Sequence, residues 1–353
     1  MQLQHVDNYT PFEWFAFEKM APGMHIHDVL IVKAACQILL DGNAYRIAAV
    51  PEGEIAPIHM SDQAHDFDRN AYASLRVAGD TVLYKPATDL LLSGAAEFSG
   101  RRGQASWAAE VSVRSHGKLR TQTLILHGER HWQWSLLKGW HLSEPTVCER
   151  IDLRYELAYG GSYAQQDRWV RHDPNPVGRG FLPLDRMDKH VYYPAARIEL
   201  AANRLSAPDK PIEVPALGPI PRTWTARKRY AGTYDNAWRD GLKQNGRADY
   251  APDFDWRFFQ TAHPQGVFEP HWRGDEHISL VGLTGDKPID AQLPGWQPVL
   301  NGQGPRGALQ PQAMRLDTVE IDLTRMRLYL TWRLHVDQDL QIEQARVHLQ
   351  NLT

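Results

Sequence analysis

The sequence predicts a mainly β protein built from antiparallel sheets, sandwich-like in two halves, with few short helices. Apolar and polar residues alternate with the period of a strand in several segments. The 23 prolines, 26 glycines and 12 tryptophans favour short strands and shaped turns over long helices. The predicted organisation is a β-rich half over 1–187, a proline-rich connection over 188–221 and a second β-rich half over 222–353. The pattern leaves open whether these halves are separate domains or one body.

The first half is predicted to be a succession of antiparallel strands. Two apolar runs rich in Val and Ile flank the Asp-Gly-Asn sequence at 41–43, which predicts a hairpin. Residues 81–94 are predicted to hold a strand up to Pro86, a turn through Thr88-Asp89 and a second strand. Alternation over 109–113 and 121–126 predicts the next strand pair.

The middle of the chain carries two glycine-rich sequences, YELAYGG at 155–161 and NPVGRGF at 175–181. The first is predicted to be a strand that ends in a glycine turn, and the second a shaped loop. The glycines around Arg179 match neither GxxxxGK[ST] nor GxGxxG, so a phosphate loop is not predicted. We expect this stretch to join the two halves, with or without contact to a partner.

The second half is predicted to hold one short helix and a clear hairpin. Asp235 is the expected N-cap of a helix over 235–244. Alternating apolar residues over 319–323 and 328–336 predict the two strands of the hairpin. The intervening side chains of the second strand, among them Thr331 and Arg333, are expected to face outward, as in a half-buried antiparallel sheet.

Composition is that of an ordinary globular protein, with 42% hydrophobic residues, 23% charged residues and a formal net charge of −3. This charge gives no reason to expect nucleic acid as a partner. The N-terminal residues show no basic-then-apolar leader, and no run reaches the length of a membrane span. A cytoplasmic location without membrane insertion is therefore expected. Cys36 and Cys148 match no metal motif and are expected to be reduced thiols.

The sequence contains no set of residues in the spacing of a known catalytic site. A cluster of imidazoles and carboxylates could bind a divalent ion, although its spacing fits no known metal motif: His59, Asp62, His65, Asp66 and Asp68. There is no GxSxG sequence for a nucleophile. We therefore predict no catalytic residue, no bound metal, no cofactor and no enzymatic activity. A metal-dependent hydrolase using the His59–Asp68 region and a carbohydrate-binding β-sandwich stay open as alternatives.

The order of several short motifs along the chain is more specific than any one of them. The motifs are YKPATD at 84–89, GER at 128–130 with Trp132, the two glycine-rich sequences, GPI at 218–220 with Trp224, YAGTYD at 230–235 with Trp238, DFD at 253–255 with RFFQ at 257–260, RGDE at 273–276, and the segment 317–333. In this order the sequence resembles the domain-of-unknown-function family 2169, whose members accompany type VI secretion effectors in Gram-negative bacteria. Residues 33–36 depart from the family, which more often has a Lys-Gly-Thr-Phe-like strand there.

The resemblance implies a cytosolic adaptor or chaperone that binds a type VI secretion effector and helps load it onto the spike complex. The implied partners are the effector and a spike or tip component, and no catalytic residues come with the family. Ten residues, most of them in matched motifs, are expected to divide between structural and partner-contacting roles: Lys85, Asp89, Tyr155, Tyr159, Tyr163, Asn175, Arg179, Phe181, Trp224 and Arg273.

Overall fold

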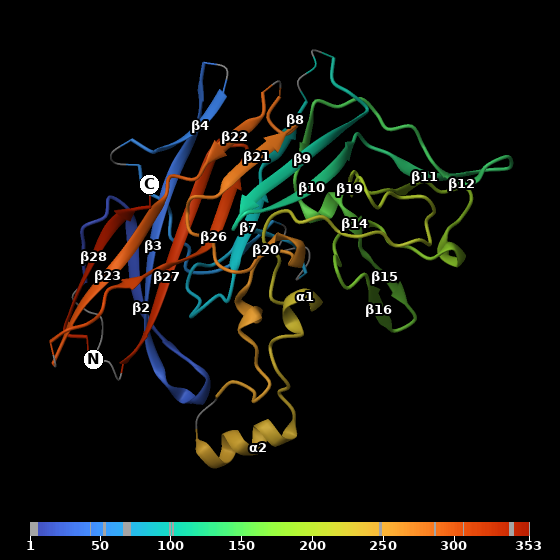
Figure 1. Ribbon diagram of the computed structural model, residues 1–353. Coiled ribbons are helices and arrows are strands. Elements are labelled where there is room, and N and C mark those ends of the chain that lie inside the picture. Colours follow the sequence, from blue (N-terminus) through green and yellow to red (C-terminus); the bar gives the residue numbers. More distant parts are fainter. Residues whose placement is uncertain are drawn as a thin grey trace.

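The computed structural model describes residues 6–42, 44–51, 54–65, 72–98, 100, 102–246, 249–285, 287–305, 307–338 and 342–352. Strands make up 46% of the chain and helical residues 9%, so the predicted mainly β class with antiparallel sheets is confirmed. Three large sheets form the body of the molecule, and smaller hairpins extend from it (Figure 1).

A seven-stranded sheet lies at the centre of the described chain, in the order β2-β3-β27-β26-β7-β20, with β4 also paired to β3. Its strands are β2 (Glu13–Met20), β3 (Ile26–Asp41), β4 (Ala44–Ala49), β7 (Thr88–Ser93), β20 (Val267–Phe268), β26 (Arg315–Asp322) and β27 (Arg327–Asp337). The predicted hairpins β3–β4 and β26–β27 are both present. Thr88 and Asp89 begin a strand and do not form the expected turn, because β7 lies between β26 and β20 and bonds to both.

Two five-stranded sheets contribute to the same hydrophobic core as the central sheet. The second sheet has the order β19 (Ile198–Leu200), β10 (Lys118–His127), β9 (Ser106–Ser115), β21 (His277–Val281) and β22 (Ile289–Gln292). The third contains β1 (Val6–Asn8), β28 (Gln344–Asn351), β23 (Trp296–Gly304), β24 (Gly307–Ala308) and β25 (Gln312–Ala313). The core therefore takes residues such as Val319, Leu124 and Leu300 from all three sheets.

Strands from the two predicted halves pair with each other. β3 pairs with β27, β7 with β26, β9 with β21 and β1 with β28. Backbone hydrogen bonds therefore run between residues before 187 and residues after 222 in all three large sheets, which places both halves in one body.

The remaining strands form small sheets. They are β11 (His131–Ser135) with β12 (Gly139–Leu142) and β18 (Tyr193–Pro194); β13 (Arg150–Asp152) with β8 (Ala95–Glu97); β14 (Tyr159–Gly160) with β17 (Arg179–Gly180); β15 (Ser162–Gln165) with β16 (Arg168–Arg171); and β5 (Gln63–Ala64) with β6 (Leu75–Val77). Leu153, Tyr155, Leu157, Ala158 and Tyr159 are all buried, but Tyr155–Leu157 forms a 3-10 turn and not the predicted strand.

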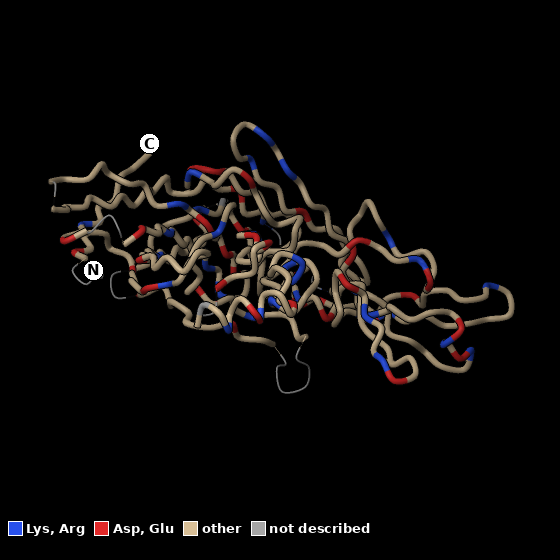
Figure 2. Tube along the Cα trace, turned by 90° about the horizontal axis from the view of Figure 1, so that it is seen from below, with Lys and Arg blue, Asp and Glu red and all other residues tan. Residues whose placement is uncertain are grey.

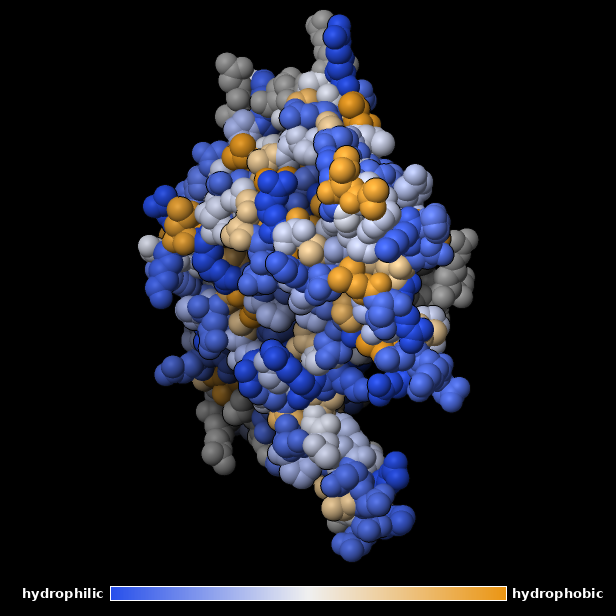
Figure 3. All heavy atoms as spheres, turned by 90° about the vertical axis from the view of Figure 1, so that its right-hand side faces the viewer, coloured by the Kyte–Doolittle hydropathy of each residue, from blue (hydrophilic) through white to orange (hydrophobic). Residues whose placement is uncertain are grey.

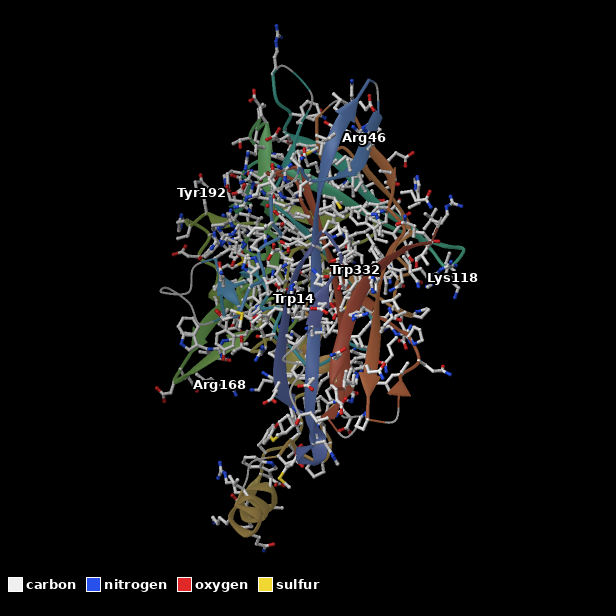
Figure 4. All side chains as sticks on the ribbon, turned by 90° about the vertical axis from the view of Figure 1, so that its left-hand side faces the viewer. Trp14, Arg46, Lys118, Arg168, Tyr192 and Trp332 are labelled. Carbon is white, nitrogen blue, oxygen red and sulfur yellow. The ribbon has the colours of Figure 1, made fainter. Side chains whose placement is uncertain are left out.

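The predicted helix is present as α2 (Asn236–Asn245), and the Asp235 side chain accepts a hydrogen bond from the Trp238 backbone N–H (3.0 Å). A second, one-turn helix, α1 (Thr225–Lys228), was not predicted. Short 3-10 turns lie at Pro22–Met24, Leu184–Arg186, Trp256–Phe259 and Pro264–Gly266. Figures 1 and 4 show that α2 lies on an arm away from the sheets. Among the described residues, no helix is long and apolar enough to cross a membrane.

The middle of β27 is buried on both faces, which corrects the expectation of a half-exposed strand. Thr331 and Arg333 were expected to face outward, and both are buried. Arg333 Nη1 donates to the backbone carbonyls of Asp80 (2.7 Å) and Val82 (2.8 Å), and its Nε bonds to the Asp317 carboxylate (2.6 Å). Loops thus cover this face, and its side chains form a polar layer beneath them.

Candidate functional site

Lys85 and Asp89 form a buried ion pair in this polar layer. Lys85 Nζ lies 2.8 Å from Asp89 Oδ2 and also donates to the hydroxyls of Thr318 (2.8 Å) and Thr261 (3.2 Å). Asp89 further accepts from the Thr261 backbone N–H (2.7 Å) and from Gln260 Nε2 (2.7 Å). The YKPATD motif therefore holds the RFFQ segment against the central sheet, across 171 residues of sequence.

Asn175 connects the two glycine-rich sequences. Its side chain is fully buried, and Nδ2 donates to the backbone carbonyls of Tyr155 (2.8 Å) and Tyr159 (3.0 Å). Gly178 packs so closely that a Cβ there would lie 2.5 Å from Asn175 Nδ2 and 2.6 Å from the Ala158 carbonyl. The glycines thus allow two backbone segments to touch, which is a packing role.

Tyr155 and Trp224 are buried side chains that contact each other edge to face, with ring centroids 5.1 Å apart. The Tyr155 hydroxyl accepts from the Leu217 backbone N–H (3.1 Å), and burial raises the pKa of this phenol. Trp224 Nε1 donates to the Tyr72 carbonyl (2.9 Å). The polar atoms and the rings of both side chains therefore have their partners inside the protein.

The ten residues expected to share structural and contacting roles separate into two groups by burial. Six are buried: Lys85, Asp89, Tyr155, Tyr159, Asn175 and Trp224. Four reach the surface: Tyr163, Arg179, Phe181 and Arg273. A side chain in the first group cannot touch a partner without local opening of the fold.

The four surface residues do not form one patch. The rings of Tyr163 and Phe181 lie 5.7 Å apart between centroids, and Arg179 Nη1 binds the Glu129 carboxylate (3.0 Å). Arg273 belongs to another region, where it borders a cavity beside the β9–β10 turn. The structure thus brings three of these residues near NPVGRGF and leaves the fourth apart.

A cavity of about 580 Å³ opens on the polar face of the central sheet. Lys33, His59, Glu320 and Tyr329 contribute to its lining. Burial raises the pKa of Glu320 to about 7, against the opposing attraction of Lys33. Lys33 itself pairs with Asp80 (2.9 Å), and burial lowers the pKa of His59. The Glu320 carboxyl can therefore exchange a proton near neutral pH or accept a cationic group.

This cavity includes part of the predicted metal region. His59, Gln63 and His65 line it. Asp66 and Asp68 lie outside the described residues. Within the described part of the chain, no group of three or more His, Cys, Asp or Glu side chains is arranged to hold a metal ion.

A second buried polar network surrounds Glu199. His127 Nε2 lies 2.8 Å from its carboxylate, and Arg130 and Arg204 lie 3.3 Å from it. The Ser106 hydroxyl meets His127 Nδ1 at 2.7 Å. These contacts hold the pKa of Glu199 down to about 2, although burial alone would raise it. Ser, His and Glu in this order resemble a nucleophile with its base, but the imidazole is buried and the network ties β9, β10 and β19 together.

The hairpin β11–β12 ends in the most exposed leucines of the described chain. Leu136 is 87% and Leu137 96% exposed. The hairpin itself is well supported, because Trp132 is buried, Lys189 Nζ lies 4.5 Å from the centre of the Trp134 ring, and β18 pairs with β11. Figure 1 shows the hairpin extending from the body, and Figure 3 views the molecule from that side. Sequence reasoning missed this site, since Leu-Leu resembles core sequence.

The protein is thus a mainly antiparallel β protein. Most of its matched motif residues are buried, and the tip of its β11–β12 hairpin is apolar and exposed. Residues 25–333 match the family described as "Uncharacterized protein conserved in bacteria (DUF2169)". The match covers most of the chain, so the protein belongs to this family, as the order of motifs predicted. Curated proteins and solved structures give no match to the chain.

Proposed function

We propose that this protein is an adaptor or chaperone that binds a type VI secretion effector in the cytoplasm and helps load it onto the spike complex. The exposed apolar tip of β11–β12 is the observation that carries the proposal. Folding does not require Leu136 and Leu137 to be apolar, because neither is buried. Two adjacent, solvent-exposed leucines on a well-packed hairpin are suited to insert into an apolar pocket of another protein.

The segment that packs beside β11 also favours a protein partner. Val191 and Tyr192 are also exposed, and the Tyr192 ring lies 4.6 Å from the ring of His131 on β11. The sequence here carries both signs of charge, with Lys138 in the β11–β12 turn and Asp185, Asp188 and Lys189 shortly before Val191. Figure 2 shows red and blue segments mixed at this end of the molecule. Mixed charge around an apolar centre is the composition of a protein–protein interface, whose rim is polar.

The family resemblance supplies the kind of partner. The members of the family that the motifs resemble accompany type VI effectors, so we propose such an effector as the protein whose apolar pocket receives the tip. The buried pairs at Lys85–Asp89 and Asn175 give this scaffold the rigidity that a preformed binding surface needs.

The experiment is co-purification from the native bacterium with the tagged full-length protein, combined with deletion of its gene. We expect an effector encoded beside the gene and a spike component to be recovered, and we expect the deletion to abolish secretion of that effector. Recovery of neither protein, together with unchanged secretion, would contradict the proposal.

A further inference from the structure

β2 forms a long open edge of the central sheet. All eight residues from Glu13 to Met20 pair with β3 without a bulge, and no other described strand pairs with β2. The strand contains no proline. Natural proteins shorten, kink or cover such edges because their unpaired N–H and C=O groups bind other strands. Figure 4 views the molecule from the side of this edge, with Trp14 labelled on β2.

The backbone groups that face outward can be assigned from the turn after β2. Ala21 and His25 continue the register beyond the last strand pair, Met20 and Ile26, and the Ala21 N–H donates to the His25 carbonyl (2.8 Å). Ala21 and His25 are therefore a hydrogen-bonded pair. Hydrogen-bonded and non-bonded pairs alternate along an antiparallel ladder. The odd-numbered residues of β2 therefore bond to β3, and even-numbered residues such as Ala16 direct their N–H and C=O groups outward.

We propose that two copies of this protein pair through β2, antiparallel, about a two-fold axis at Ala16. In this register Glu13 lies opposite Lys19 of the second copy, and Phe15 lies opposite Phe17 of the second copy. The two-fold axis makes each pair occur twice, as in any self-complementary interface. The central sheets of the two copies then join into one continuous sheet.

Charge complementarity selects this occupant and this register. Glu13 lies opposite Lys33 in its own sheet, but the Lys33 ammonium is paired with Asp80. In the part of the chain that the structure describes, neither Glu13 nor Lys19 has a hydrogen bond or an ion pair, and the second copy gives each a directly opposed residue of opposite charge. Moving the two-fold axis by one residue keeps every side chain on its face of the sheet but loses the charge pair. An axis at residue 15 places Glu13 opposite Phe17 of the second copy, and an axis at residue 17 places Lys19 opposite Phe15 of the second copy. Opposite charges on directly opposed residues stabilise a strand pair, whereas like charges destabilise it.

The aromatic side chains support the same pairing. The rings of Phe15 and Phe17 stack in one copy with centroids 5.7 Å apart, and both side chains are only half-buried. Two copies would bring four such rings together on one face of the joined sheet. On the other face Trp14, which is 38% exposed, lies opposite Glu18 of the second copy.

The test uses the full-length protein and measures mass by light scattering through the micromolar range. Wild type is expected to be a dimer that dissociates on dilution. Glu13→Lys and Lys19→Glu each place like charges opposite one another twice, so each is expected to raise the dissociation constant at least tenfold. An equimolar mixture of the two variants restores both opposite pairs and is expected to form a heterodimer, detected by native mass spectrometry.

Two further variants control for folding. Glu144→Lys makes the same charge change at an exposed residue outside β2 and is expected to leave the dimer intact. Ala16→Pro removes an outward N–H that β3 does not use, so it is expected to yield a folded monomer. A monomeric wild type, single-charge variants that dimerise like wild type, or a mixture that fails to pair would overturn the proposal. So would an effector that binds monomeric wild type but not Ala16→Pro, because β2 would then belong to the effector.

Discussion

Replacing Asp89 by Asn is expected to be among the most damaging single changes in the molecule. Four donors reach the Asp89 carboxylate, from Lys85, Gln260 and Thr261, at 2.7 to 2.9 Å. The amide keeps the shape of the side chain but removes the charge that balances the buried Lys85 ammonium. Breaking a buried ion pair by removing one partner costs about 3–5 kcal/mol. That is a large part of the roughly 5–15 kcal/mol by which a domain is stable.

Urea unfolding followed by tryptophan fluorescence measures this loss, and Asp240→Asn is the matched control. Asp240 pairs with Lys243 on the exposed surface of α2, where an ion pair contributes at most about 1 kcal/mol. In the double variant Lys85→Met with Asp89→Leu, no buried charge is left alone, so it is expected to lose less stability than Asp89→Leu. A loss below about 1 kcal/mol for Asp89→Asn would refute the structural role assigned to this motif.

Three further predictions concern the body of the molecule. The Glu320 pKa is raised to about 7 in the folded state from about 4.3 when unfolded. Between these values the folded state binds more protons, so stability falls as pH rises. Glu320→Gln should remove on the order of 3 kcal/mol of that loss, measured by unfolding curves across the same pH range. Gly178→Ala should lower the thermal midpoint sharply, since a Cβ there would meet backbone and side-chain atoms, whereas Gly241→Ala on exposed α2 should raise stability by about 0.5–1 kcal/mol. Limited proteolysis within 188–221 should leave fragments that stay associated in gel filtration, because strands of both halves pair; release of two folded fragments would show separate domains.

Much of the fold could be predicted from local sequence patterns. The β26–β27 hairpin follows from alternation over 319–336, and α2 follows from the Asp235 cap. Burial of Arg333 could not be predicted, because the loops that cover it come from distant sequence and leave no trace in a two-residue period. The 3-10 turn at Tyr155–Leu157 was not predicted, because the apolar residues of the sequence alternate there without forming a strand.

The candidate site was less accessible to sequence reasoning than the fold. Motif order identified the family, and the structure shows that motif residues such as Lys85 and Asn175 are internal. The exposure of Leu136 and Leu137 could not be predicted, because an apolar pair in a short turn resembles core sequence. A buried lysine and an exposed leucine both reverse the usual preference of their residue type, and three-dimensional structure is needed to see either.

The measurement that tests the central claim most directly is the affinity of the effector for a variant of the hairpin tip. Leu136→Ser with Leu137→Ser is compared with Leu119→Ser, which changes an isolated exposed leucine on β10. Burying one leucine contributes about 1.5–3 kcal/mol, so the tip variant is expected to bind the co-purified effector at least tenfold more weakly, with an unchanged thermal midpoint. The Leu119 variant is expected to bind like wild type. Equal affinity of all three proteins would contradict the assignment of the β11–β12 tip as the effector-binding surface.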